Sequence, residues 1–433
     1  MDRRFLVLAV LLISGAGAHA QNATQTPLNL KDAEALALKN HPQVLAAQAT
    51  ALEFNEHVVE ERSAYYPNVD YALTGSGGNP QGRIGAGFLP ASRLFDRLGT
   101  GILLSQLITD SGRTPNLVAS SRLQAQATQQ TYQATRYDVL LAVNQAYFGA
   151  LRAEAVIKVA QQTVAARQAV TDQVTELAKN KLRSDVDLAF ADVNLAQAKL
   201  LLLRAQDEVR AAFADLTQAL GAQQETNYKL ADEPLPPSPS PDPESLIAQA
   251  LTNRPDFLSL QLQYQAARKF QRAERDLSYP TVSLLGTAGA LPEINQILSA
   301  KIPNNYEAAA LNIEVPVFNG HLFAARREAA RYHADAEDQR VRDLQERIAR
   351  DVRVEWSRSQ TSYQNIDVTA ELLREASMAL DLAQGRYNLG LSSIVELSQA
   401  QLNLTEAEIE NLNAKYEYQT VYATLQYTMG LLR

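Results

Sequence analysis

The sequence predicts a mainly helical protein with a small β part, in which long coiled-coil-like helical hairpins follow two short groups of strands. Three observations lead to this fold class. Apolar residues, with alanine prominent among them, recur at alternating spacings of three and four residues over runs of roughly 65 and 38 residues. Two stretches containing Gly, Thr and Ser instead show the alternation of strands. The whole pattern occurs twice along the 433 residues.

Composition excludes several classes of protein. The chain has no cysteine, which rules out disulfide frameworks, thiolate metal sites and lipid attachment to cysteine. A formal net charge of −8 argues against nucleic acid as a partner, because phosphate binding needs a basic surface. No His-x-x-x-His pair, phosphate-binding loop or nucleophile elbow is present in the sequence, so we expect neither a cofactor nor an enzyme.

Residues 1–20 are expected to be a cleaved signal peptide. The charged start Asp2-Arg3-Arg4 precedes an apolar run, residues 5–13, and a small-x-small cleavage site, residues 18–20. A membrane anchor is the alternative, but it needs about 20 apolar residues and this run is shorter. The mature chain would then carry no lipid anchor, because no cysteine follows the cleavage site.

Four landmarks recur in the same order, at an offset of 213 residues for the first two and 209 for the last two. They are Asn40-His41-Pro42 with Asn253-Arg254-Pro255, Tyr66-Pro67 with Tyr279-Pro280, Val143 with Val352, and Leu220-Gly221 with Met429-Gly430. We therefore predict a duplication, with a first repeat at 21–221, a second at 244–433, and a proline-rich linker at 222–243 between them. So many prolines predict a stiff extended segment; binding of a partner domain is the alternative use of such a stretch.

Each repeat has the same internal order. In the first repeat, helical patterns at 30–62 precede strands at about 68–108 and a helical hairpin at about 114–221; in the second, the corresponding ranges are 244–276, 281–317 and 320–430. Gly/Pro loops are expected between the strands at 75–97 and 292–304. The strands have two interpretations, a membrane barrel or two hairpins packed on the helices. In lipid, four strands leave open edges, so several chains would have to close one barrel that a helical tube continues.

This combination resembles the TolC-type outer-membrane efflux protein family. The resemblance covers nearly the whole mature chain and rests on the Asn-x-Pro of each repeat, the Tyr-Pro before each strand pair, and two longer segments. These segments are Val317-Phe318-Asn319-Gly320 and Arg386-Tyr387-Asn388-Leu389-Gly390-Leu391-Ser392-Ser393-Ile394-Val395-Glu396-Leu397.

The resemblance implies a homotrimer in the bacterial outer membrane. Four strands per chain would build a trimeric 12-stranded β-barrel in the lipid, and the helical hairpins would form a periplasmic α-barrel. Residues 21–40 and about 222–253 would contribute to an equatorial belt. The implied partners are a periplasmic adaptor (membrane fusion protein) and an inner-membrane pump, proton-driven or ABC, which supply energy and cargo to a passive exit duct.

The resemblance places the candidate site at the turns of the two hairpins. The residues expected to dock the adaptor are Lys181, Leu182, Arg183, Ser184 and Asp185 in the first turn, and Gly390, Leu391, Ser392 and Ser393 in the second. Helix capping by Ser184 and by Ser392 or Ser393 is the alternative role. The first turn departs from the family pattern, because Lys181 stands where Gly390 stands in the second turn, and this leaves the geometry of the first turn open.

Four further residues fall on the positions of a periplasmic gate. Asp187 and Tyr387 match a closing hydrogen-bonded pair, Glu396 matches an acidic ring, and Gln399 matches a second ring position that has lost its charge. Three carboxylates around a constriction would favour cations. The alternative for Asp187 and Glu396 is a solvated first turn of a helix.

Two further features are the tyrosines beside the strands and a strongly charged helical segment. Tyrosines flank the strands at positions 65, 66, 71 and 279, where they anchor at the lipid boundary or pack in the core. Residues 326–353 are expected to form an exposed helix with many salt bridges. The function predicted is an outer-membrane channel of a tripartite efflux or type I secretion system; a secreted or periplasmic coiled-coil scaffold without a pore is the alternative.

Overall fold

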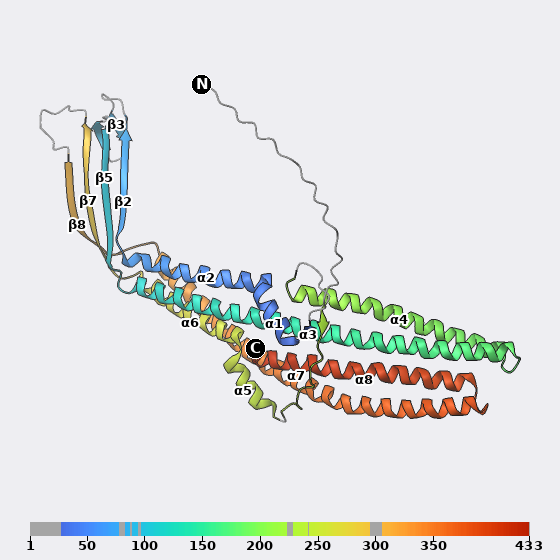
Figure 1. Ribbon diagram of the computed structural model, residues 1–433. Coiled ribbons are helices and arrows are strands. Elements are labelled where there is room, and N and C mark those ends of the chain that lie inside the picture. Colours follow the sequence, from blue (N-terminus) through green and yellow to red (C-terminus); the bar gives the residue numbers. More distant parts are fainter. Residues whose placement is uncertain are drawn as a thin grey trace, which may run out of the picture.

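The computed structural model describes residues 27–77, 83–86, 89–93, 97–222, 228–240, 242–294 and 305–432. The expected signal peptide, residues 1–20, lies outside these residues. Within them, long helices lie side by side as a wall, and a narrow sheet extends from one end (Figure 1). The prediction of a mainly helical fold with a small β part is confirmed.

Two helices of 67 residues, α3 (Arg113–Lys179) and α7 (Leu322–Asn388), run the length of this wall. Each turns into a helix of 35 residues, α4 (Asp185–Ala219) after α3 and α8 (Ile394–Thr428) after α7. The expected runs of roughly 65 and 38 residues are therefore confirmed. Nearer the sheet, the shorter helices α2 (Pro42–Arg62) and α6 (Pro255–Asp276) take the places of α4 and α8.

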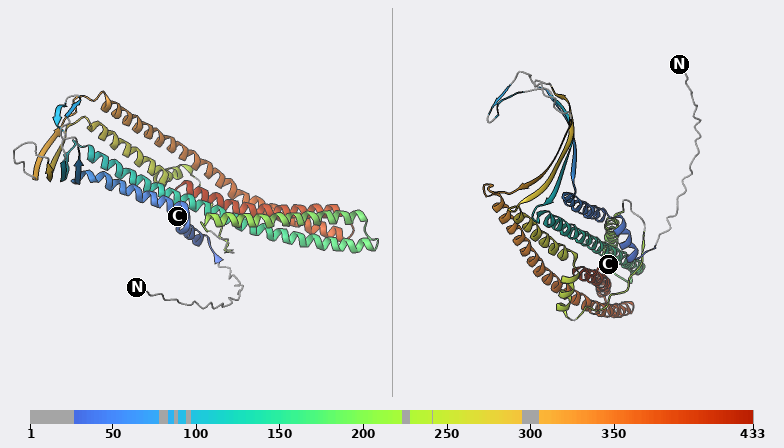
Figure 2. Two further views of the ribbon diagram at one scale, coloured as in Figure 1. Left: turned by 90° about the horizontal axis from the view of Figure 1, so that it is seen from above. Right: turned by 90° about the vertical axis from the view of Figure 1, so that its left-hand side faces the viewer.

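The wall is one helix thick near the sheet. Its order there is α2, α3, α6, α7, and at the far end it is α4, α3, α8, α7 (Figures 1 and 2). Buried alanines allow the helices to approach closely, as Ala191, Ala198 and Ala205 do on the face of α4 toward α3. Leucine knobs such as Leu195 lie between them.

The recurring sequence landmarks meet in space. α1 (Leu30–Asn40) ends just before Pro42 begins α2, because a proline disfavours helical backbone at the residue that precedes it, here His41. Gly221 ends the first hairpin with φ +67°, and a Cβ there would lie 2.7 Å from the Cα of His41. The second repeat has the same close approach, because Gly430 lies against the backbone where α5 (Pro243–Asn253) ends.

The region expected to lie at the equator fastens the two repeats together. β1 (Pro27–Leu28) pairs in parallel with β6 (Lys229–Leu230). The fully buried hydroxyl of Tyr147 lies beside this pair, 2.9 Å from the carbonyl oxygen of Leu28 and 2.7 Å from that of Ala231. The linker that follows is held on the second hairpin by Trp356, whose Nε1 donates to the Ser240 carbonyl at 2.7 Å.

The main sheet has four antiparallel strands in the order β2-β5-β7-β8. They are β2 (Asn68–Ser76), β5 (Arg97–Thr109), β7 (Thr281–Ile294) and β8 (Asn305–Glu314). The last strand ends before residue 317, the expected end, because Pro316 lacks a backbone N–H for the ladder. A short 3-10 turn, Ser63–Tyr65, leads from α2 toward β2.

The prediction of a loop at 75–97 is partly wrong. It holds a small antiparallel hairpin, β3 (Arg83–Ala86) with β4 (Leu89–Arg93), besides the end of β2. The second predicted loop, at 292–304, also begins too early, since β7 runs on to Ile294, and its residues 295–304 lie outside the described residues. Backbone pairing between neighbouring strands decides where the strands end, and short segments containing Gly and Pro do not indicate this pairing in the sequence.

Candidate functional site

The main sheet has two chemically different faces. Its ladder pairs Leu104 with Val69 on one side and with Gly286 on the other, and side chains of paired residues share a face. This face carries the aliphatic and aromatic side chains of Val69, Tyr71, Leu73, Ile102, Leu104, Val282, Leu284, Leu311 and Ile313. Most of them are exposed in the single chain. Glu307 is the one charged residue among the described side chains of this face, near the end of the strands remote from the helices.

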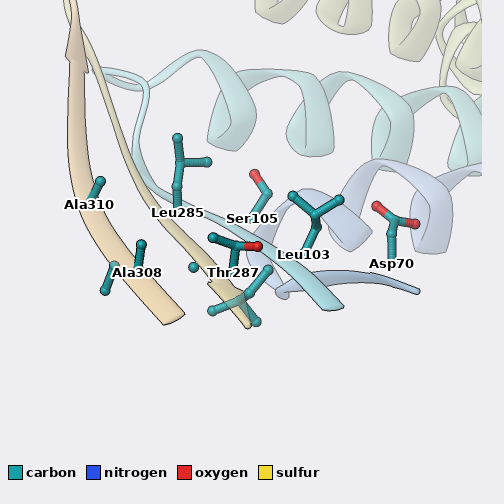
Figure 3. A pocket seen from close by; sticks show the side chains of 10 residues that line it. Asp70, Leu103, Ser105, Leu285, Thr287, Ala308 and Ala310 are labelled. Atoms are coloured by element: carbon teal, nitrogen blue, oxygen red, sulfur yellow. The ribbon is translucent and has the colours of Figure 1, made fainter. Parts of the chain in front are cut away.

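The opposite face is more polar. It carries Asn68, Asp70, Thr74, Ser105, Thr281, Ser283, Thr287, Asn312 and Glu314, together with Leu103 and Leu285. Several of these line a hollow of about 460 Å³ over the middle of the strands, and Figure 3 shows the labelled side chains directed to the same side of the sheet. An apolar face and a polar face on one sheet are typical of strands between lipid and water.

The sheet is open at both edges. β2 and β8 each pair on one side only among the described residues, so their outer backbone groups lack ladder partners. Tyr65, Tyr66, Tyr71 and Tyr279 are exposed, so the core role considered for these tyrosines is wrong. The first two and Tyr279 lie where the strands meet the helices, and Tyr71 lies on the apolar face.

At the far end of the wall, the two hairpin turns have the same backbone shape. Lys181 and Gly390 both adopt left-handed conformations, with φ of +60° and +75°. The geometry of the first turn, which the sequence left open, therefore matches that of the second, although a lysine pays about 1 kcal/mol for this conformation where glycine does not. Ser184 caps α4 in a reciprocal capping box with Asp187, and Ser393 rather than Ser392 caps α8.

The structure does not form the expected pair between Asp187 and Tyr387. The carboxylate of Asp187 accepts from the backbone N–H of Ser184 at 3.2 Å. Tyr387 is 1% exposed, and its hydroxyl has no hydrogen-bond partner among the described residues. Burial raises the pKa of Tyr387, and the nearby Arg183 guanidinium lowers it in part.

Arg183 holds Tyr387 instead. Its guanidinium lies 4.4 Å from the centre of the Tyr387 ring, and one of its nitrogens donates to the Tyr387 carbonyl at 3.2 Å. A residue expected at the adaptor-docking tip thus joins the first hairpin to the second. The sequence offered no pattern for this contact, because it joins residues 204 positions apart.

The two residues expected at acidic-ring positions, Glu396 and Gln399, also have partners in their own chain. Arg386 donates through Nε to the Glu396 carboxylate at 2.9 Å, and both side chains are exposed. Gln399 donates to Asn403 at 2.8 Å. Each chain therefore pairs the carboxylate of Glu396 with the guanidinium of Arg386, and this pairing reduces the net negative charge around Glu396.

More contacts tie the hairpins together above the tips. Asn194 of α4 donates to the Ser398 hydroxyl of α8 at 2.7 Å, and Arg167 of α3 donates to the side-chain oxygen of Gln401. The hydroxyls of Thr163 and Thr405 meet at 3.5 Å. We call this set of contacts, with that of Arg183 on Tyr387, the inter-hairpin seam.

The edge helices at this end expose apolar stripes. On α4 the stripe consists of Val186, Phe190, Val193 and Leu200, and on α7 it consists of Val368, Leu372 and Leu382. Their spacings of three, four, seven and ten residues keep them near one side of each helix, yet no helix of the described chain covers them. Such stripes indicate a helix partner from another chain.

The predicted charged helix is largely confirmed along the sheet-side half of α7. Ion pairs at spacings of three and four residues, such as Arg342 with Asp338 and Arg347 with Asp343, follow its exposed side. Glu337 differs, because it is buried and paired with Arg340. None of the helices in the described ranges contains an apolar stretch long enough to cross a bilayer.

Comparison with known proteins agrees with this architecture. Residues 35–222 and 246–431 match the family described as "Outer membrane efflux protein". The chain is 23% identical to the outer membrane efflux protein BepC of Brucella suis over 95% of this chain and 87% of that relative. It is 25% identical to the outer membrane protein TolC of Vibrio cholerae, over 93% and 91% of the two chains.

The fold is similar to that of a crystal structure of CusC. The TM-score is 0.80 at 19% identity, with 93% of this chain and 92% of that chain covered. A structure of the outer-membrane channel OprN gives the same TM-score at 18% identity, over 93% and 89%. Because the family match spans both repeats, the chain belongs to the outer membrane efflux protein family.

Proposed function

We propose that this protein is the outer-membrane channel of a tripartite efflux or type I secretion system. The observation that carries the proposal is the sheet, which has an apolar and a polar face but two open edges. An open edge in hydrocarbon leaves backbone groups unpaired, so such a sheet is stable in lipid only as part of a closed barrel. The helices continuing from it would then form a periplasmic tube.

A homotrimer completes this arrangement. β2 with α2 lies at one edge of the chain and β8 with α7 at the other, so copies can join edge to edge. The exposed stripes support the same contact, because α4 runs toward the equator and α7 runs toward the tips. Phe190 would then lie near Leu382 of the next copy, and Leu200 near Leu372.

The partners are a periplasmic adaptor and an inner-membrane pump, proton-driven or ABC. Relatives of this chain include BepC, named as an efflux protein, and AprF of Pseudomonas aeruginosa, named as an alkaline protease secretion protein. The exposed tip residues Leu182 and Leu391 offer an apolar surface at which an adaptor can dock. The channel itself would be passive, with transport energy supplied by the pump.

The hairpin tips would form the periplasmic gate. Three copies of Glu396 surround the narrowing, each accompanied by Arg386, and Gln399 adds a neutral position. Replacing Glu396 by glutamine leaves the three guanidiniums unmatched, so we expect cation selectivity of the purified trimer to fall. The measurement is the reversal potential in planar bilayers, with Glu371→Gln, an exposed carboxylate away from the tips, as the control. Unchanged selectivity would remove Glu396 from the gate.

The channel itself is tested by fractionating the cell envelope. We expect the protein in the outer membrane as a detergent-requiring, heat-modifiable trimer that conducts ions in a planar bilayer. The competing function is a secreted or periplasmic coiled-coil scaffold. A water-soluble monomer or dimer in the periplasm would establish that function and contradict the channel.

A further inference from the structure

Two arginines on the inter-hairpin seam have opposite energetic consequences. Arg183, in the first turn, touches the second hairpin through both its charge and its hydrogen bond: the guanidinium lies over the Tyr387 ring at 4.4 Å and donates to the Tyr387 carbonyl. Neither contact requires the guanidinium to be fully desolvated, since Arg183 is only partly buried. Contacts of this kind stabilise the state in which the hairpins touch.

Arg167 is in a different position. It lies on α3 12 residues before the helix ends at Lys179, which is roughly 18 Å above the turn. The residue is 7% exposed, and its hydrogen-bond partner across the seam is the neutral amide of Gln401. No carboxylate lies within ion-pair distance of it in the part of the chain that the structure describes. Burial lowers the pKa of Arg167, in keeping with a desolvated charge.

The surroundings of Arg167 explain how the charge could be rehydrated. It lines a groove of about 420 Å³ between α4 and α8, together with Asn194, Arg204 and Glu406. Displacing α8 removes the Gln401 contact and opens this groove to water. A buried charge without an opposite partner is costly, so its rehydration favours separation of the hairpins.

We propose that Arg183 and Arg167 together set the balance between touching and separated hairpins, Arg183 holding the tips together and Arg167 pushing them apart. This inference rests on the proposed channel function, in which separation of the hairpins opens the tube. The two sites lie on the same seam but share no partner, so their effects are expected to be nearly additive.

The experiment uses the full-length trimer and measures the hairpins directly. Because the chain has no cysteine, Leu182→Cys and Leu389→Cys introduce two exposed spin-label sites, one on each tip. Labelled chains are diluted with unlabelled ones so that each trimer holds a single pair. Pulsed electron resonance then gives the fractions of short and long tip-to-tip distances, and planar bilayers give the conductance of the same variants.

Arg183→Ala is expected to raise the ratio of long to short distances about tenfold and to increase conductance. Arg167→Met, which removes the charge but keeps an apolar side chain of similar length, is expected to lower that ratio about tenfold. The double variant should return to within about threefold of the parent. The controls are Lys179→Ala, an exposed residue at the end of α3, and Arg204→Met across the groove from Arg167, and both should leave the distances unchanged.

Each outcome decides a separate point. The trimer of each variant is judged folded if it is still heat-modifiable. If a folded Arg167→Met trimer has separated hairpins or unchanged distances, the opposing role of Arg167 is wrong. If Arg183→Ala does not shift the distances, Arg183 does not hold the tips. Arg167→Gln serves as a second neutral variant should the methionine fail to fold. A protein that shows the expected distance shifts but never conducts would uphold the two arginine roles and overturn the channel.

Discussion

Replacing Leu104 by arginine places a charge on the apolar face of the sheet, at the middle of β5, one of its two inner strands. Its neighbours on that face are Val69 and Gly286, and a Cβ built at Gly286 would touch the Leu104 side chain at 3.5 Å. The adjacent Leu103 gives a matched control, because it has the same side chain and strand but points to the polar face. Its cross-strand neighbour there is Asp70, which an arginine could pair with.

The expected difference follows from the solvent on each side. An arginine on the lipid face of a barrel costs about 2–4 kcal/mol near the bilayer midplane. Three copies make this about 6–12 kcal/mol per trimer, which is similar to the whole stability of many domains. On the polar face, Leu103→Arg should cost less than about 1 kcal/mol, as surface substitutions usually do.

The assay is the yield of heat-modifiable trimer in the outer membrane, followed by urea unfolding of whatever trimer assembles. Leu104→Arg should reduce assembly severely, whereas Leu103→Arg should leave it close to that of the parent. Equal losses for both variants, or a greater loss for Leu103→Arg, would refute the assignment of the two faces.

Three further predictions concern the assembly and the equator. Leu372→Asp, in the exposed stripe of α7, should dissociate the detergent-extracted trimer without reducing helix content, measured by sedimentation and circular dichroism; an intact trimer would rule out this stripe as the contact. Tyr147→Phe removes the donor beside two buried carbonyls and should cost about 1–3 kcal/mol in urea unfolding, with Tyr132→Phe as the control; equal stabilities would show that the hydroxyl is dispensable. Burial lowers the pKa of His41, so the folded state binds fewer protons than the unfolded state. The free energy of unfolding should therefore be highest above the unfolded pKa of about 6.5 and fall at lower pH. His41→Asn keeps a helix-capping side chain, and its free energy of unfolding should fall less than that of the parent between pH 7.5 and 5.5. Parallel pH profiles for the two proteins would contradict the role of His41.

The long helices could be predicted because their pattern is local and repetitive. Apolar residues at spacings of three and four specify α3 and α4, and Pro42 and Pro255 mark the breaks before α2 and α6. The duplication could also be predicted, and the structure adds its reason at Gly221: the glycine is needed where the end of the hairpin approaches His41. Such close contacts leave a trace in the sequence because only one residue type fits.

The contacts at the tips could not be predicted in the same way. The position of Tyr387 was expected from the resemblance, but the side chain that holds it is that of Arg183, while the carboxylate of Asp187 accepts in the capping box. Which side chain reaches across depends on how two hairpins, about 200 residues apart in the chain, are rotated against each other. The small β3–β4 hairpin was missed for a similar reason, since pairing and not the local composition formed it.

The central claim is that copies of this chain join edge to edge and close both the sheet and the wall of helices. The most direct test is a single-particle structure of the protein extracted from the outer membrane in detergent. It should show three copies, with β2 of one chain hydrogen-bonded to β8 of the next, Leu104 facing the detergent and Leu103 facing the lumen. A monomer with free strand edges, or an assembly that leaves β2 and β8 unpaired, would contradict it.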